Sequence, residues 1–145
     1  MIDPWNPTPQ EIRTWAYDPA AADPCQDWDL ALSWLQDESV YFSLATDESC
    51  PRRQFFLSLL YLMVGDAVRT DFRARPKPIV MGLIEHGNAY LHPDIIAWQR
   101  RSRDLIANPL TFDYDAWCGG QLAYAASNQD GGEPSDATER RSRAF

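Results

Sequence analysis

The chain has 145 residues, 45% of them hydrophobic, and a formal net charge of −8. This length suits one domain with its own core, because domains peak at roughly 100–150 residues, and the composition is that of a globular protein. Three cysteines without CxxC spacing argue against a disulfide framework or a zinc knuckle, and they suit a reducing cytoplasm.

The charge is unevenly distributed along the chain. Residues 1–50 carry a net charge of −9, residues 51–112 a net charge of +4, and residues 113–145 a net charge of −3. Nucleic acid backbones and anionic membranes require a basic face, so the first third argues against both as partners. It favours a basic protein partner, since complementary charge steers association. The alternative is that the acidic surface only keeps the protein in solution.

Two helix starts are predicted in the first third of the chain. The run Thr8-Pro9-Gln10-Glu11 combines a capping threonine, a proline at the first helical position and a capping-box glutamate, which predicts a helix to about Tyr17. The run Asp23-Pro24-Cys25-Gln26 repeats the pattern and predicts a second helix through about Gln36. The inward stripe of this second helix is expected to consist of Cys25, Trp28, Ala31, Leu32 and Leu35, flanked by Leu30 and Trp34.

The stretch from Pro51 to Phe72 is the most apolar part of the chain. Between Phe55 and Val64 only Ser58 is clearly polar, so a helix here is apolar over most of its circumference. A run of about 10–14 apolar residues indicates a core helix, because a bilayer requires about 20. Only a narrow stripe of this helix is polar or small, namely Gln54, Ser58, Tyr61, Gly65 and Arg69.

Shorter helices are expected on either side of this stretch. Residues 40–46 predict one or two helical turns, and residues 79–86 predict a short helix that Gly87 ends as a left-handed C-cap. The run His92-Pro93-Asp94 opens a helix to about Ala107, which Asn108-Pro109 ends. Residues 111–126 predict a last helix or pair of short helices.

These elements predict an all-α fold, a compact single-domain bundle of about six helices around the buried central helix. The domain is expected to cover residues 1–126. Residues 127–145 are rich in Gly, Pro, Ser and charge, which predicts a disordered C-terminal tail.

Few side chains are candidates for a catalytic or metal-binding role. Glu85, His86, His92 and Asp94 are the nearest approach to a metal-ligand set, but their spacing matches no helix-borne metal motif. Cys118 has no histidine near it in sequence, so a structural role is favoured over a nucleophilic one. A structural ion pair is predicted between Asp66 and Arg69.

The chain contains none of the sequence motifs GxxxxGK[ST], GxGxxG, GxSxG and HExxH. No catalytic residue, metal site or cofactor is therefore expected. Two alternatives stay open: an enzyme of a motif-poor helical class, and an acidic adaptor that mimics nucleic acid.

The runs Gln26-Asp27-Trp28-Asp29-Leu30 and Phe112–Gly120 are similar to parts of small bacterial proteins. At the level of class, a small, acidic, all-helical and motif-poor chain resembles the immunity, or antitoxin, proteins. This resemblance implies a cytoplasmic inhibitor that binds a cognate toxin protein with a basic surface and occludes its active-site cleft. It implies no direct contact with nucleic acid or membrane.

The residues expected to contact such a partner are acidic or aromatic and lie outside the predicted core stripes. Aromatic anchors within a charged surround are the usual energetic pattern of a tight interface. The acidic candidates are Asp27, Asp29, Asp37, Glu38, Asp47 and Glu48. The aromatic candidates are Trp5 and Tyr41.

Overall fold

The structure is a computed structural model that describes residues 1–119. This part of the chain is all-α: it contains six α-helices, two short 3₁₀ helices and one π-helix, and no strand. None of its helices is long and apolar enough to cross a membrane. The elements are α1 (Pro9–Ala16), α2 (Trp28–Ser33), α3 (Glu38–Thr46), α4 (Arg53–Arg69), α5 (Lys77–His86), η1 (Gly87–Ala89), α6 (Pro93–Ala107), η2 (Pro109–Thr111) and η3 (Asp115–Gly119).

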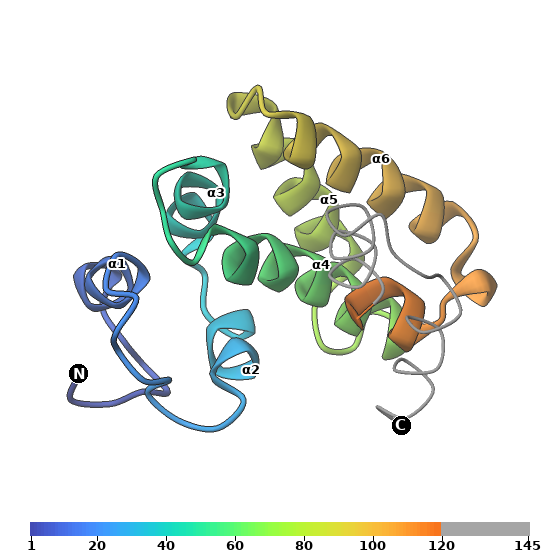
Figure 1. The fold of residues 1–145 in the computed structure, drawn as a ribbon. Helices are drawn as coiled ribbons and strands as arrows, with labels where there is room; N and C mark the ends of the chain where they lie inside the picture. The colour runs from blue at the N-terminus through green and yellow to red at the C-terminus, as the bar shows by residue number, and fades with distance from the viewer. Residues whose placement is uncertain (120–145) are drawn as a thin grey trace, which may run out of the picture.

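The helices α1, α2 and α3 lie at one end of the molecule, and α5 and α6 lie at the other (Figure 1). Between them runs α4, which contacts α2, α3, α5, α6 and η3. Eleven of its seventeen residues are buried, so its side chains form much of the core. The remaining core comes from the inner faces of the helices around it.

The start of α1 forms as the sequence predicts. The Thr8 hydroxyl accepts a hydrogen bond from the Glu11 backbone N–H at 3.1 Å, and the Glu11 carboxylate accepts one from the Thr8 N–H at 2.9 Å. This reciprocal pair satisfies two donors that the first turn of a helix leaves unpaired. The bond from the Thr8 backbone also lowers the pKa of Glu11.

The predicted start of α2 is wrong. The helix begins at Trp28 rather than at Pro24, because Asp27 adopts a left-handed conformation with φ of 55° and interrupts any helix before it. Aspartate tolerates this conformation better than most residues. The predicted inward stripe is confirmed for Trp28, Ala31 and Leu32, which are buried, and Cys25 and Leu35 are partly buried.

The predicted left-handed cap at Gly87 is also wrong. Gly87 has φ of −60°, and the chain continues into η1 instead of reversing. The glycine is required by packing, since a Cβ at this position would lie 2.9 Å from Gln99 Nε2. The Gln99 side chain donates hydrogen bonds to the Ile84 carbonyl at 2.7 Å and to Asn88 at 2.9 Å.

The predicted helix from His92 is confirmed as α6. The His92 ring accepts a hydrogen bond from the Asp94 backbone N–H at 3.1 Å and so caps the helix, which has Pro93 at its first position. Its inner face buries Ile95, Trp98 and Ser102. Of the predicted last helices, η2 and η3 lie within the described residues; the rest of 111–126, and the predicted tail, lie outside them.

A cluster of aromatic rings joins α1 and α2 to the first turn of α4. Trp15 makes edge-to-face contacts with Trp28 and Phe55, with ring centroids 4.7 and 4.9 Å apart. The Arg52 guanidinium lies 4.0 Å above the Trp15 ring and donates a hydrogen bond to the Asp18 carbonyl at 3.1 Å. Such contacts add to the burial of apolar area. They hold the acidic first third of the chain in a fixed position against α4.

Candidate functional site

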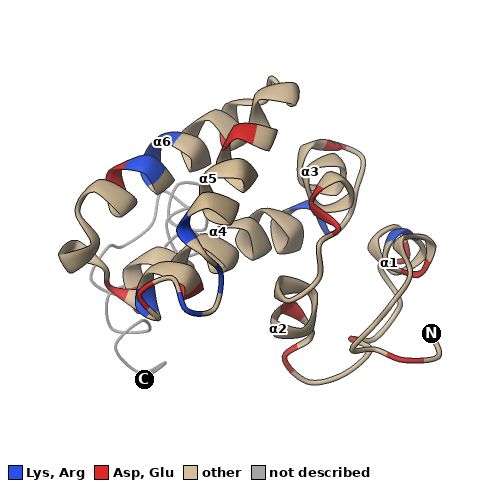
Figure 2. Cartoon of the chain, turned by 180° about the vertical axis from the view of Figure 1, so that it is seen from behind, with Lys and Arg blue, Asp and Glu red and all other residues tan. Residues whose placement is uncertain are grey.

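Many of the acidic residues lie at the end of the molecule that contains α1, α2 and α3, and others lie on α5 and α6, as the red segments in Figure 2 show. Residues 14–51, which we call the acidic end, include eight acidic residues and no lysine, arginine or histidine. Most of the blue segments lie on α4, on the link between α4 and α5, and on α6. The fold keeps part of this separation, although Arg53 and Arg75 pair with Glu48 and Glu38 of the acidic end.

The structure leaves the carboxylates of Asp27 and Asp37 without a recorded side-chain hydrogen bond or ion pair among the described residues. Both occupy the position before a helix, and neither side chain caps it. Asp29 is partly exposed and accepts a hydrogen bond only from the adjacent Leu30 N–H, at 2.9 Å. Trp5 is 56% exposed, which leaves most of its ring available to a partner.

The carboxylate of Glu38 forms an ion pair within the fold and is not free. It pairs with Arg75 at 3.6 Å, and the Arg75 side chain also donates a hydrogen bond to the Ser33 carbonyl at 2.5 Å. Only 21% of the Glu38 side chain and 11% of the Arg75 side chain are exposed. The pair ties the start of α3 to the link between α4 and α5.

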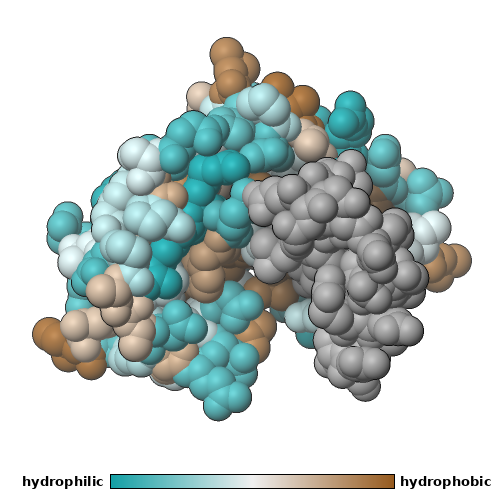
Figure 3. Space-filling model, in the orientation of Figure 1, coloured by the Kyte–Doolittle hydropathy of each residue, from teal (hydrophilic) through white to brown (hydrophobic). Residues whose placement is uncertain are grey.

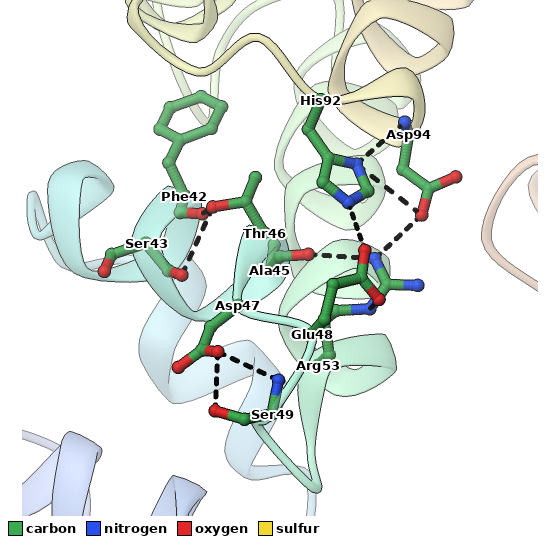
Figure 4. Close-up of polar contacts among 10 residues, drawn as sticks. All are labelled: Phe42, Ser43, Ala45, Thr46, Asp47, Glu48, Ser49, Arg53, His92 and Asp94. Carbon is green, nitrogen blue, oxygen red and sulfur yellow. Dashed lines mark hydrogen bonds and ion pairs between the residues drawn. The ribbon is translucent and has the colours of Figure 1, made fainter.

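Asp47 accepts a hydrogen bond from the Tyr17 hydroxyl. It also accepts from the Ser49 backbone and hydroxyl at 2.9 and 2.7 Å, as Figure 4 shows. The bond to Asp47 raises the pKa of Tyr17 to about 12. The same bond, with those from Ser49, lowers the pKa of Asp47. Asp47 thus ties the end of α3 to the end of α1.

Replacing Tyr17 by phenylalanine is expected to remove a small, pH-dependent contribution to stability. Because the pKa of Tyr17 is raised from 10.0, that contribution is complete below pH 10 and disappears as the pH rises through about 12. Because the pKa of Asp47 is lowered from 3.8, the same contribution to stability is present above pH 3.8. It disappears as the pH falls through the pKa of Asp47 in the folded state. Urea midpoints of the two proteins should differ most at pH 5–9 and converge on either side of this range. An equal difference at pH 7 and pH 12 would contradict the assignment.

Glu48 belongs to a charged cluster that joins three elements (Figure 4). Its carboxylate lies 2.7 Å from His92 Nε2 and 3.8 Å from Arg53 Nε. Arg53 also pairs with Asp94 at 2.7 Å and donates to the Ala45 carbonyl at 3.0 Å. Arg53, the first residue of α4, therefore connects the end of α3 to the start of α6. The Glu48 side chain is 74% exposed, so it remains accessible to a partner in spite of these contacts.

Tyr41 cannot serve as the surface anchor predicted from the sequence. Its side chain is fully buried, and its hydroxyl donates a hydrogen bond to the Leu32 carbonyl at 2.8 Å. Burial raises the pKa of Tyr41. The aromatic residue that is exposed in this region is Trp34, with 63% of its surface in solvent, which sequence reasoning placed beside the core stripe of α2.

The structure does not bring the four possible metal ligands together. The His86 ring stacks on Phe42 and Tyr90, whereas His92 contacts Glu48. Among residues 1–117, whose side chains are described, no group of three or more His, Cys, Asp or Glu could hold a metal ion. The side chain of Cys118 lies outside the described residues. The predicted pair between Asp66 and Arg69 is confirmed.

Two open hollows of about 350 Å³ each occur on the described surface. One lies between α6 and the segment from η2 to η3, and it includes Arg101, Asp104 and Trp117. The other lies between the N-terminal arm and α1, and it includes Glu11 and Asp18. Neither hollow contains a histidine or cysteine among its described residues, so neither pairs a nucleophile with a histidine base.

Comparisons with protein-family models, with curated proteins and with solved structures found no match.

Proposed function

We propose that this chain is an immunity-type protein, of bacterial origin and cytoplasmic, that binds and inhibits a cognate toxin enzyme by occluding its basic active-site cleft. The observation that carries the proposal is the acidic end. It places eight carboxylates and no basic residue within 38 consecutive residues. As part of the same proposal, the helices form one bundle organised on α4, which supports the acidic end as a rigid unit.

The chemistry of such inhibition is electrostatic. Enzymes that act on nucleotides or nucleic acids have basic clefts, and carboxylates of the inhibitor would occupy the positions of substrate phosphates. Complementary charge raises association rates by about 10–10³-fold, and the effect falls as the ionic strength rises. The cluster of aromatic rings that joins α1 and α2 to α4 supports this role, because a rigid surface loses little conformational entropy on binding.

Neutralising carboxylates of the acidic end is expected to slow association with the partner, which must first be identified. The immobilised full-length chain is used to capture proteins from the source organism at 50 mM salt, and the captured protein is then purified. The acidic-end variant replaces three residues that no ion pair constrains: Asp23→Asn, Asp27→Asn and Asp37→Asn. The matched control replaces three exposed acidic residues outside it: Asp71→Asn, Glu85→Gln and Asp104→Asn.

Each triple variant changes the net charge from −8 to −5, so only the position of the lost charge differs. The acidic-end variant should associate about tenfold more slowly at 50 mM salt and lose much of its salt dependence, whereas the control should stay within about twofold of the wild type. Equal effects of the two variants would show that position does not matter. If no protein is captured, or if the chain turns over a small molecule, the inhibitor function is wrong.

A further inference from the structure

The outer face of α2 carries two exposed apolar side chains one helical turn apart. Leu30 is 38% exposed and Trp34 is 63% exposed. Trp34 follows the last residue of α2 with helical angles, φ of −86° and ψ of −12°, so the two side chains lie on the same face. The opposite face buries Trp28, Ala31 and Leu32 in the core.

Most of the Trp34 side chain lies in solvent. Its ring has no recorded ring contact or hydrogen bond within residues 1–117, in contrast to Trp15, Trp28, Trp98 and Trp117, each of which makes a ring contact. Trp34 borders a small hollow with Met63 and Ala74 but remains mostly in solvent. On the face of the molecule shown in Figure 3, apolar side chains are scattered among hydrophilic ones. On α2, an exposed tryptophan and an exposed leucine lie one helical turn apart.

Acidic groups surround this face. Asp27 lies at its N-terminal end and Asp37 three residues after Trp34, and both carboxylates are free of recorded ion pairs in the described chain. Asp66, which pairs with Arg69, borders the same hollow as Trp34, and so does the basic residue Arg75. Its charge is taken up by Glu38 and by the Ser33 carbonyl, and its side chain is 11% exposed. The face is therefore an apolar centre with an acidic rim.

We propose that this α2 face, formed by Leu30, Trp34, Asp27 and Asp37, is the docking surface for a basic protein, with Trp34 as its anchor. The inference rests on the proposed function and names the interface that the function requires. Charge determines the class of partner: nucleic acid and anionic membrane are repelled by the rim, and a second copy that docked through the same α2 face would oppose acidic groups with acidic groups. A basic protein surface pairs with the carboxylates of the rim and covers the Trp34 ring at the same time.

The anchor is expected to act on dissociation rather than on association. Tryptophan is enriched among interface residues whose removal costs most, and such residues sit centrally inside a ring of groups that exclude water. Loss of one of them weakens binding by about 30-fold or more, which is mainly an increase in the dissociation rate. The rim carboxylates, in contrast, govern the association rate and its salt dependence.

The test uses the full-length chain and the protein captured with it as described above. The test variant is Trp34→Ala, and the matched control is Ile96→Ala, which removes a half-exposed apolar side chain from α6. Trp34→Ala should bind more weakly by about 30-fold or more with a nearly unchanged association rate, and Ile96→Ala should bind like the wild type. A photo-crosslinking amino acid at position 34 should label the captured protein within a basic peptide, and the same group at position 96 should not.

Each other outcome has a distinct meaning. If a protein is captured and responds to the acidic-end charges, but Trp34→Ala binds it like the wild type, the α2 face is not the docking surface and the proposed function stands. If the wild-type chain forms a dimer that Trp34→Ala abolishes, a second copy covers the face and the inference is overturned. If nothing is captured, the proposed function and this inference fail together. Circular dichroism of Trp34→Ala should match that of the wild type, because the side chain is exposed.

Discussion

Leu60→Asp is expected to unfold the protein. Leu60 lies in the middle of α4 with none of its surface exposed, among the largest fully buried side chains of the core. An unpaired carboxylate at this position would lose its hydration without gaining a partner, which costs several kcal/mol. That loss is comparable to the whole stability of a typical domain, about 5–15 kcal/mol. Far-UV circular dichroism should show loss of helix, and urea unfolding should show no cooperative transition.

The control is Gln54→Asp, which places the same group at an exposed position in the first turn of the same helix. A negative charge there is favoured by the helix dipole, so the urea midpoint should change little. If Leu60→Asp instead folds with the midpoint of the control, the residue is not in the core, and the packing of α4 described above is incorrect.

Gly65→Ala is expected to destabilise the protein by about 1–3 kcal/mol, the usual effect of overpacking. A Cβ at Gly65 would lie 2.4 Å from Cδ1 of Trp117 and 3.3 Å from Cε1 of Phe112. The Trp117 ring cannot easily move away, because its Nε1 donates a hydrogen bond to the Tyr61 carbonyl at 2.6 Å. The substitution should therefore displace η3 from α4.

Gly82→Ala provides a control of opposite sign. Gly82 is exposed in the interior of α5, and a Cβ there would meet nothing within 4 Å. Alanine should stabilise this helix by about 0.5–1 kcal/mol, because glycine loses more backbone entropy on folding. Urea midpoints should therefore move in opposite directions. In a Trp117→Ala background the penalty at Gly65 should vanish, and a penalty that persists there would show that Trp117 is not the neighbour responsible.

The contact between Gly65 and Trp117 illustrates where sequence reasoning ends. The pattern of α4 correctly shows a narrow stripe of small and polar residues, which includes Tyr61 and Gly65. Periodicity cannot show that a ring 52 residues later occupies this stripe. The same limit applies to the bond between Tyr17 and Asp47 and to the contact between Glu48 and His92, because each joins segments that are distant in the chain.

Local rules succeed where the determinants are local. The capping box of α1, the start of α6 at Pro93 and the all-helical class follow from neighbouring residues, and the structure confirms each of them. The start of α2 does not follow, since Pro24 has the pattern of a first helical residue and the left-handed Asp27 leaves no distinct signal.

The candidate surface was partly predictable for a similar reason. Charge is readable directly from the sequence, so the acidic end could be recognised without a structure. Of the two aromatic anchors, Trp5 is exposed as the prediction requires, but Tyr41 is not, because five of the nine residues of α3 are buried, Tyr41 among them. Trp34, one residue beyond the end of α2, could be assigned to the surface only once the end of that helix was known.

The most direct test of the central claim is a titration of enzymatic activity. The protein captured by this chain is assayed for nuclease or nucleotide hydrolase activity, at a concentration well above its dissociation constant, while the full-length chain is added in steps. The inhibitor function predicts a linear loss of activity that ends at one equivalent of the chain, and a right-shifted, curved titration for Trp34→Ala. Full activity of the captured enzyme at several equivalents of the bound wild-type chain would contradict it.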